Sequence, residues 1–446
     1  CNMLDTFKNA WKIPDLRRRI LFTVMMLIVF RFGAHIPVPY LSADAMKAFL
    51  GAGGTDLFSL FDVFTGGAFS NATVMAMGVS PYINASIIIQ LLTVAIPSLE
   101  RLAKEGLEGR KKINKITRYL GIVLAFIQGA GLYVTLYNMS VTNQVDAIIN
   151  PSVLTFFVIV LTFTAGTAFI IWLGELITEK GLGNGVSLII FAGIVSRIPT
   201  AGVNIYKQFL ATGVTVKGLV IVAAIIVVAI AAITFVVWFS DAERRIPVQY
   251  AKRVVGRKMY GGQSTNIPIK IAAGGVMPII FASSIMAFPA TIVRLVSGGN
   301  MPDSSTIGGL ILSCLSAGYG PAWTSVVYSV LYFLLIIFFT YFYSTIQFNP
   351  IEISNNIKKS GGFIPGIRPG KSTSDYIAKT TSRLNLVGAV FLGVIAIMPV
   401  VFGAVFNMPG LQLGGTSLLI MEGVALETVR QIESQMVMRH YHGFLE

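Results

Sequence analysis

The sequence predicts an all-α polytopic membrane protein with ten transmembrane helices, and two observations carry this fold class. Of the 446 residues, 54% are hydrophobic and only 12% are charged, whereas soluble domains carry about 25% charged residues. The apolar residues are also gathered in long runs, and a bilayer core takes roughly 20 residues as helix. A soluble enzyme with a large core does not have this composition.

Eight runs are good candidates for membrane spans, and two shorter ones are weaker. The eight are 20–37, 72–96, 119–137, 153–174, 218–239, 271–295, 326–342 and 386–402. The weaker two are 186–198 and 411–426. The first run follows three arginines, as in a signal peptide, but it continues past Arg31 and has no small-residue cleavage site. We therefore expect it to be retained.

Basic residues orient these spans, because Lys and Arg gather in cytoplasmic loops. The basic segments are the N-terminus, 98–118, 240–270 and 347–383. The loops without Lys or Arg are 138–152, 296–325 and 403–410. Ten spans with both chain ends in the cytoplasm fit this alternation, provided that 186–198 crosses. One loop disagrees, since 199–217 should be external yet holds Lys207 and Lys217. Cytoplasmic loops rather than a nucleic-acid partner explain the net charge of +14.

A short apolar stretch, DLFSLFDVFTGGAFSNA at 56–72, lies on the external side of the second span. It is too short to cross a bilayer, contains Gly66 and Gly67, and carries Asp56 and Asp62. Non-helical backbone at membrane depth is tolerated only where it is packed in protein or lines a cavity. Two interpretations remain open: a short helix that folds back into such a cavity, or an interfacial helix on the outer membrane surface.

Two basic loops have features beyond topology. The loop 244–270 mixes alternating apolar residues with cations and aromatics, and 358–376 has a turn rich in Gly and Pro that bears Arg368. Membrane anchoring explains most of their charge. It explains less well why both loops are long and rich in turns, which is typical of a docking surface for a large cytosolic partner.

Residues with catalytic or metal chemistry are scarce. His35 stands alone, while His440 and His442 lie in a polar tail without other metal ligands. The sequence PGIRPGKS at 365–372 lacks the glycine that a phosphate-binding loop needs five residues before its Gly-Lys pair. The sequence therefore predicts neither an enzyme nor a cofactor or metal site.

Paired aliphatic residues occur in two of the spans. Val79 and Ile83 are four residues apart and share a helix face, and Val186 and Ile190 repeat this spacing. By itself this spacing favours ordinary helix packing.

Five segments together resemble the bacterial SecY family, the channel-forming subunits of the Sec protein translocon. They are SPYINASIIIQLL, GLGNGVSLIIFAGI, ERRIPVQYAKRVVGRKMYGGQSTNIPIK, FIPGIRPGKSTSDY and GGTSLLI, in order along nearly the whole chain. The resemblance implies two pseudo-symmetric halves around a central pore, 1–198 with spans one to five and 199–446 with spans six to ten. It implies a channel that passes unfolded secretory polypeptides and releases hydrophobic segments sideways into lipid.

The resemblance also implies the site residues. A re-entrant plug helix at about 57–69 would close the channel with Leu57, Phe58, Leu60, Phe61 and Phe64. A hydrophobic pore ring would consist of Val79, Ile83, Val186, Ile190, Ile280 and Ile420. A lateral gate would be lined by Asn84, Gln90, Ser284 and Phe288. Docking loops at 240–270 and 347–379 would bind a motor or ribosome through Lys252, Arg253, Arg257, Lys258 and Arg368.

The implied partners are the SecE and SecG subunits, the SecA motor, the ribosome, signal sequences with their preproteins, and the lipids of the inner or plasma membrane. Glu422 departs from the family pattern, which usually has an aliphatic residue there. An alternative from another class is an ion-coupled secondary transporter of small molecules. It would need ionisable residues at mid-membrane, and the spans offer few beyond Arg31 and Glu422.

Overall fold

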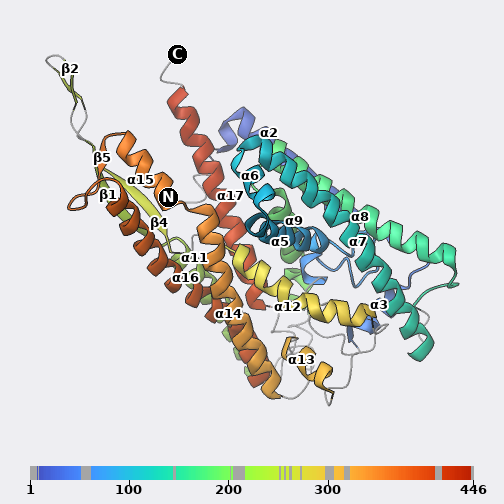
Figure 1. Ribbon diagram of the computed structural model, residues 1–446. Coiled ribbons are helices and arrows are strands. Elements are labelled where there is room, and N and C mark those ends of the chain that lie inside the picture. Colours follow the sequence, from blue (N-terminus) through green and yellow to red (C-terminus); the bar gives the residue numbers. More distant parts are fainter. Residues whose placement is uncertain are drawn as a thin grey trace. The chain divides into compact units, whose positions relative to one another are not determined.

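The structure is a computed structural model, and helices dominate the part of the chain that it describes (Figure 1). The described residues are 8, 10–51, 62–143, 147–200, 202–203, 216–250, 253–255, 258–260, 264–271, 274–296, 306–315, 322–406 and 414–442. They fall into two compact units. The first comprises Cys1–Ala224, Ser284–Tyr328 and Val424–Glu446, and the second comprises Ile225–Ser283 and Ser329–Gly423. The predicted division into halves at residue 198 stays a prediction.

The first unit contains a group of packed helices that run through its first 200 residues. They are α2 (Pro14–Gly33), α3 (Ala43–Gly51), α5 (Ser80–Ala95), α6 (Pro97–Lys104), α7 (Leu107–Asn143), α8 (Val153–Lys180) and α9 (Gly185–Ser196). Helix α7 packs between α5 and α8, and α8 also contacts α2 and α9. Figure 1 shows α7 and α8 running side by side. The helix α13 (Ile307–Leu315) also belongs to this unit.

Four long helices contribute residues to both units or lie at their boundaries. They are α11 (Val216–Ser240), α12 (Met277–Val296), α14 (Ala322–Gln347) and α17 (Gly414–His442).

The number of membrane-spanning helices is a separate question. Among all described residues, four helices are long and apolar enough to cross a membrane, or five if the bent pair α5 and α6 is one span. Helix α9 and parts of α11 and α12 are shorter apolar helices. The count of ten spans stays a prediction.

Local chemistry sets several helix ends. The Ser152 side chain accepts a hydrogen bond from the Thr155 N–H and caps α8. Asn184 does the same for α9 through the N–H groups of Val186 and Ser187. Helix α5 ends just before Pro97, and α6 leaves it at an angle of 102°, because proline disfavours helical backbone in the residue before it.

The predicted second span, 72–96, is wrong at its start, because the helix begins only at Ser80. The residues before it form turns, with Ala72 at φ +50° and Gly78 at φ +56°, which no helix contains. Pro81 then suits the first helical turn, where its missing N–H costs no hydrogen bond. The predicted first span, 20–37, is also wrong at its end, since α2 stops at Gly33.

The second unit holds a small sheet formed by the two predicted docking loops. Strand β1 (Glu243–Tyr250) lies between β4 (Ser264–Lys270) and the short β5 (Gly362–Phe363), and both neighbours are antiparallel to it. Alternation along β1 buries Ile246 and Val248, as expected for a strand with one covered face. We call these three strands the loop sheet. A separate hairpin pairs β2 (Arg253–Val255) with β3 (Lys258–Tyr260).

Two helices pack with the loop sheet, α15 (Pro350–Lys359) and α16 (Lys371–Phe406). The shared core consists of Ile246, Val248, Ile269, Ile357, Ile364 and Ile377. In Figure 1 these helices and strands form one cluster. The sequence analysis treated the two loops as one kind of surface but did not predict their strands.

Candidate functional site

We call residues 62–79 the connecting segment. It includes the second part of the short apolar stretch at 56–72 and ends just before α5. Residues 62–64 are helical, and the segment continues as turns. An isolated antiparallel bridge between Pro37 and Thr73 holds it beside the chain that leaves α2. On either side of this bridge, Val38 N–H donates to the Ala72 carbonyl and Val74 N–H to the Ile36 carbonyl, both at 2.9 Å.

The connecting segment is packed inside the protein. Its buried apolar residues are Ala68, Phe69, Ala72, Met75, Ala76, Met77 and Val79. Phe69 and its neighbours share a core with residues of α7 and α8, among them Leu132, Ile159 and Phe163. An interfacial helix would leave one face uncovered by protein. For residues 62–79, this burial supports the interpretation in which the chain folds back.

Glycines allow the segment to approach its neighbours closely. Gly66 and Gly67 have φ values of +67° and +90°, which side chains with a Cβ rarely adopt. A Cβ on Gly66 would also lie 2.6 Å from Arg31 Nη1 and 2.8 Å from the Gly193 carbonyl oxygen. In turn, a Cβ on Gly193 would collide with the Phe64 carbonyl. The segment therefore contacts the C-terminal parts of both α2 and α9.

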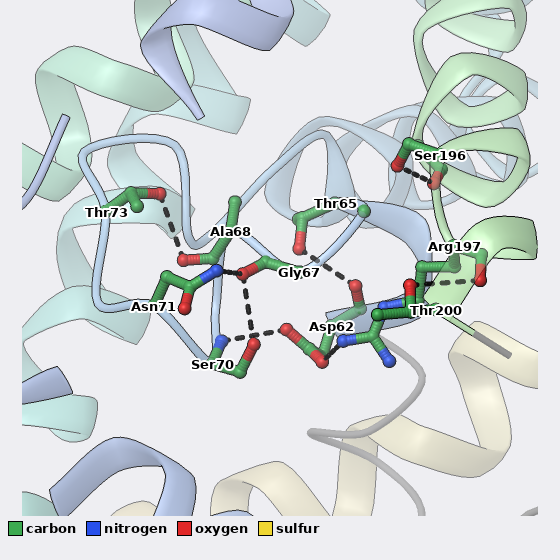
Figure 2. A network of polar contacts seen from close by, with 12 residues as sticks. Asp62, Thr65, Gly67, Ala68, Ser70, Asn71, Thr73, Ser196, Arg197 and Thr200 are labelled. Carbon is green, nitrogen blue, oxygen red and sulfur yellow. Dashed lines mark hydrogen bonds and ion pairs between the residues drawn. The ribbon is translucent and has the colours of Figure 1, made fainter. Parts of the chain in front are cut away.

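Asp62 is the centre of the polar contacts in this segment, as Figure 2 shows. The whole residue is only 3% exposed. One carboxylate oxygen accepts a hydrogen bond of 2.8 Å from the Ser70 N–H, and the other forms an ion pair with the Arg197 guanidinium. The Asp62 carbonyl accepts a further hydrogen bond of 2.8 Å from the Gly67 N–H. A buried carboxylate needs such partners, because removing a charge from water costs several kcal/mol.

Two arginines reach the segment from different helices. Arg197 stands at the C-terminal end of α9, where the helix dipole favours a cation. Arg31, in the last turn of α2, donates from Nη1 to the Gly66 carbonyl at 3.2 Å. The sequence analysis counted Arg31 only as a charge within a span, and the structure gives it a partner.

The pairing of Asp62 with Arg197 was missed by the sequence analysis. The two residues are 135 positions apart, and no local pattern joins them. The sequence offered one signal. Each residue is an isolated charge beside apolar residues, and the two charges have opposite signs. Two such charges on the same side of a membrane are candidates for each other's partner.

The predicted plug residues are only partly within the described chain. Leu57, Phe58, Leu60 and Phe61 lie outside the described residues. Phe64 is described and partly buried, and its carbonyl lies against Gly193. The connecting segment thus carries the described end of the predicted plug.

The predicted pore ring divides between the two compact units. Val79, Ile83, Val186 and Ile190 belong to the first, and Ile280 and Ile420 belong to the second. All are buried except Val186, which is partly buried and packs on Gly174 of α8. In the second unit, Val276 and Gly423 bring α12 and α17 into close contact. The ring as a whole stays a prediction.

The predicted lateral gate draws on α5 and α12. Asn84, Gln90 and Ser284 are partly buried, and Phe288 is 38% exposed. Gln90 Nε2 donates to Ser86 Oγ at 3.3 Å within α5. The pairing of these two helices in a gate stays a prediction.

Arg368 is exposed on a turn between β5 and α16. Its carbonyl accepts a hydrogen bond of 2.9 Å from Thr373 Oγ1, and the Gly370 carbonyl accepts one of 2.8 Å from Ser354 Oγ on α15. Gly366 and Gly370 supply the positive φ values of the turn. Hydrogen bonds therefore hold the backbone of the turn, while the Arg368 residue is exposed. Of the other predicted docking residues, Arg253 and Lys258 lie in the β2–β3 hairpin, and Lys252 and Arg257 lie outside the described residues.

Glu422 lies buried in α17 and accepts a hydrogen bond of 3.5 Å from Ser240 Oγ of α11. This contact gives the unexpected carboxylate a polar neighbour. In the described part of the chain, His, Cys, Asp and Glu side chains form no group of three or more that could hold a metal ion.

The SecY family model matches residues 73–429. The chain is 45% identical over 454 residues to the protein translocase subunit SecY of Mycobacterium tuberculosis, with 100% of each chain covered. It is 44% identical over 455 residues to the SecY subunit of Streptomyces coelicolor, covering 99% of this chain and 100% of that one.

Solved structures of the same architecture match nearly the whole chain. A protein-conducting channel matches with a TM-score of 0.65 at 19% identity, with 96% of both chains covered. A SecY protein studied for its plug domain matches with a TM-score of 0.67 at 19% identity and the same coverage. Sec61 from a canine ribosome–channel complex matches with a TM-score of 0.60 at 18% identity. These likenesses confirm the predicted helical membrane-channel fold.

Proposed function

This chain belongs to the SecY family and is a protein-conducting channel, and we propose that its connecting segment closes that channel when no polypeptide is passing. Unfolded secretory polypeptides would cross the membrane through it, and hydrophobic segments would leave sideways into lipid. The observation that carries the closure is the buried connecting segment, which is held by α2 and α9 through Arg31 and Arg197.

The pore ring gives this channel its passive character. Six aliphatic side chains, from the residue that precedes α5 and from α5, α9, α12 and α17, would meet at the constriction: Val79, Ile83, Val186, Ile190, Ile280 and Ile420. An apolar constriction resists ions by dewetting, yet it makes no specific bonds that would hold a passing polypeptide. The lateral gate between α5 and α12 would open this pore toward lipid. Asn84, Gln90, Ser284 and Phe288 would line it.

The loop sheet is the proposed docking platform. Because β1 pairs with β5, the two predicted docking loops form one surface with one core. Arg368 projects from this surface on a fixed turn. A SecA-type motor or a ribosome would bind here, and SecE and SecG subunits would complete the complex. The connecting segment would then face the outside, with both chain ends in the cytoplasm of a cell whose inner or plasma membrane holds the channel.

The ion-coupled transporter has no support in these findings, and no catalytic role is proposed. The channel itself has no motor, so energy must come from a partner. Arg31 is one of the two ionisable residues on which the transporter hypothesis depended. It donates to a backbone carbonyl of the connecting segment. This contact suits a structural role.

Export into vesicles tests the proposed function. The chain is reconstituted with a SecE-type partner, and SecA, ATP and an unfolded preprotein are supplied. We expect the preprotein to become protected from protease only when it carries a signal sequence and ATP is present. Vesicles that protect no preprotein, but take up a small solute in a fixed ratio to an ion, would contradict the channel.

A further inference from the structure

We infer that Asp62 and Arg197 form a charge latch, which holds the connecting segment in its seated position and must break when the channel opens. This inference rests on the proposed closure and adds the residues that set its stability. Both residues act by positioning the segment.

The latch joins two elements that approach each other closely, since a Cβ on Gly193 would collide with the Phe64 carbonyl. Asp62 belongs to the connecting segment and Arg197 to the end of α9. Beside the ion pair, the Arg197 guanidinium lies over Gly67, since a Cβ on that glycine would be 3.6 Å from Arg197 Nη2. Figure 2 shows Asp62 between Arg197 on one side and Ser70 on the other.

The two charges differ in exposure, and this difference makes the pair suitable as a latch. The Asp62 side chain is 4% exposed, whereas the Arg197 side chain is 36% exposed. In the seated position the carboxylate depends on its partner, because a buried charge without one is strongly unfavourable. Once the segment leaves, both groups can be hydrated. The ion pair therefore stabilises the seated state alone and shifts the equilibrium toward it.

A second contact supports the latch from the opposite helix. Arg31 Nη1 donates to the Gly66 carbonyl at 3.2 Å, four residues beyond Asp62. This hydrogen bond goes to a neutral carbonyl and involves no second buried charge. We therefore expect Arg31 to contribute less to seating than Arg197.

The experiment compares idle ion conductance in planar bilayers for the wild-type channel, Asp62→Asn, Arg197→Gln and the double variant. Asparagine keeps an oxygen that can accept from the Ser70 N–H and removes only the charge. We expect each single variant to raise the idle open fraction by about tenfold, which corresponds to about 1.4 kcal/mol. The double variant should be no more open than the single ones, because they remove the same interaction. Arg197→Lys keeps the cation, so its idle conductance should lie closer to the wild-type value than that of Arg197→Gln.

Glu100→Gln is the matched control, since it also breaks one carboxylate–cation pair, with Lys104, but at an exposed position. It should leave idle conductance unchanged. Export of a preprotein with a weakened signal should rise in the two latch variants and not in the control. If the wild-type channel exports preprotein while the latch variants stay as closed as the control, the latch proposal is wrong and the proposed channel function is unaffected. A wild type that exports nothing would overturn both.

Discussion

Asp62 and Glu422 are both buried acids in an apolar protein, and their surroundings differ. Asp62 has an arginine and a backbone N–H at its two carboxylate oxygens. Glu422 has the Ser240 hydroxyl at 3.5 Å. Ionised partners make shorter and stronger hydrogen bonds than neutral ones. At the scale of single residues, charge therefore fixes the structure of the connecting segment.

The pore ring gives a prediction at the same scale. Replacing Ile83 and Ile190 together with serine should hydrate the constriction and raise idle conductance by about tenfold or more, a change of about 1.4 kcal/mol. It should also relax the demand for a good signal sequence. Planar-bilayer recording measures the first effect and export of signal-defective preproteins the second.

Ile170→Ser is the control for the ring, because Ile170 is fully buried in α8 and lies outside both the ring and the core shared with the connecting segment. It should lower stability by roughly 2–5 kcal/mol, as losses of buried aliphatic side chains do, without opening the channel. Conductance that rises equally in both variants would mean that Ile83 and Ile190 are ordinary core residues.

At the scale of elements, hydrophobic runs predicted most helices. The predicted ends were wrong where glycine and proline set the true end of a helix. Apolar composition alone extended the second span back to residue 72, although Gly78 and Pro81 delay the helix to Ser80. The short α9 was predicted from the alternation of basic loops rather than from its length. The loop sheet was not predicted, because β1 and β5 pair across more than 110 intervening residues and its strands lie among charged positions.

The turn that bears Arg368 gives a prediction at the scale of elements. Arg368→Glu should leave insertion and SecE pairing intact and abolish export driven by the motor. Losing one charge-assisted contact at a partner interface costs about 2–5 kcal/mol. Export by Arg368→Lys should fall between that of the wild type and that of Arg368→Glu, since an ammonium group cannot make the bidentate bonds of a guanidinium. Motor binding and preprotein export into vesicles are measured together.

Lys115→Glu makes the same change of charge at an exposed position of α7, in the other compact unit. It should retain export. Equal export by Arg368→Glu, Arg368→Lys and this control would reduce the turn to a topological anchor.

At the scale of the whole molecule, composition and the distribution of basic residues predicted a polytopic helical membrane protein, and five motifs predicted its family. The family is confirmed by relatives that match over the full length. Individual pore and gate residues depend on how helices distant in sequence face one another. Their aliphatic or polar character was visible in the sequence, whereas their partners were not. Asp62 and Arg197 illustrate this most clearly, because only the folded chain brings them together.

The idle conductance of a channel that lacks residues 62–69 tests the central claim most directly. These residues include the helical residues 62–64, Gly66, Gly67 and Phe69 of the shared core. If the connecting segment closes the channel, the deleted form should pass ions in a planar bilayer without motor or preprotein, while the wild type stays closed. A deleted form that still exports preprotein and remains as impermeable to ions as the wild type would contradict the account.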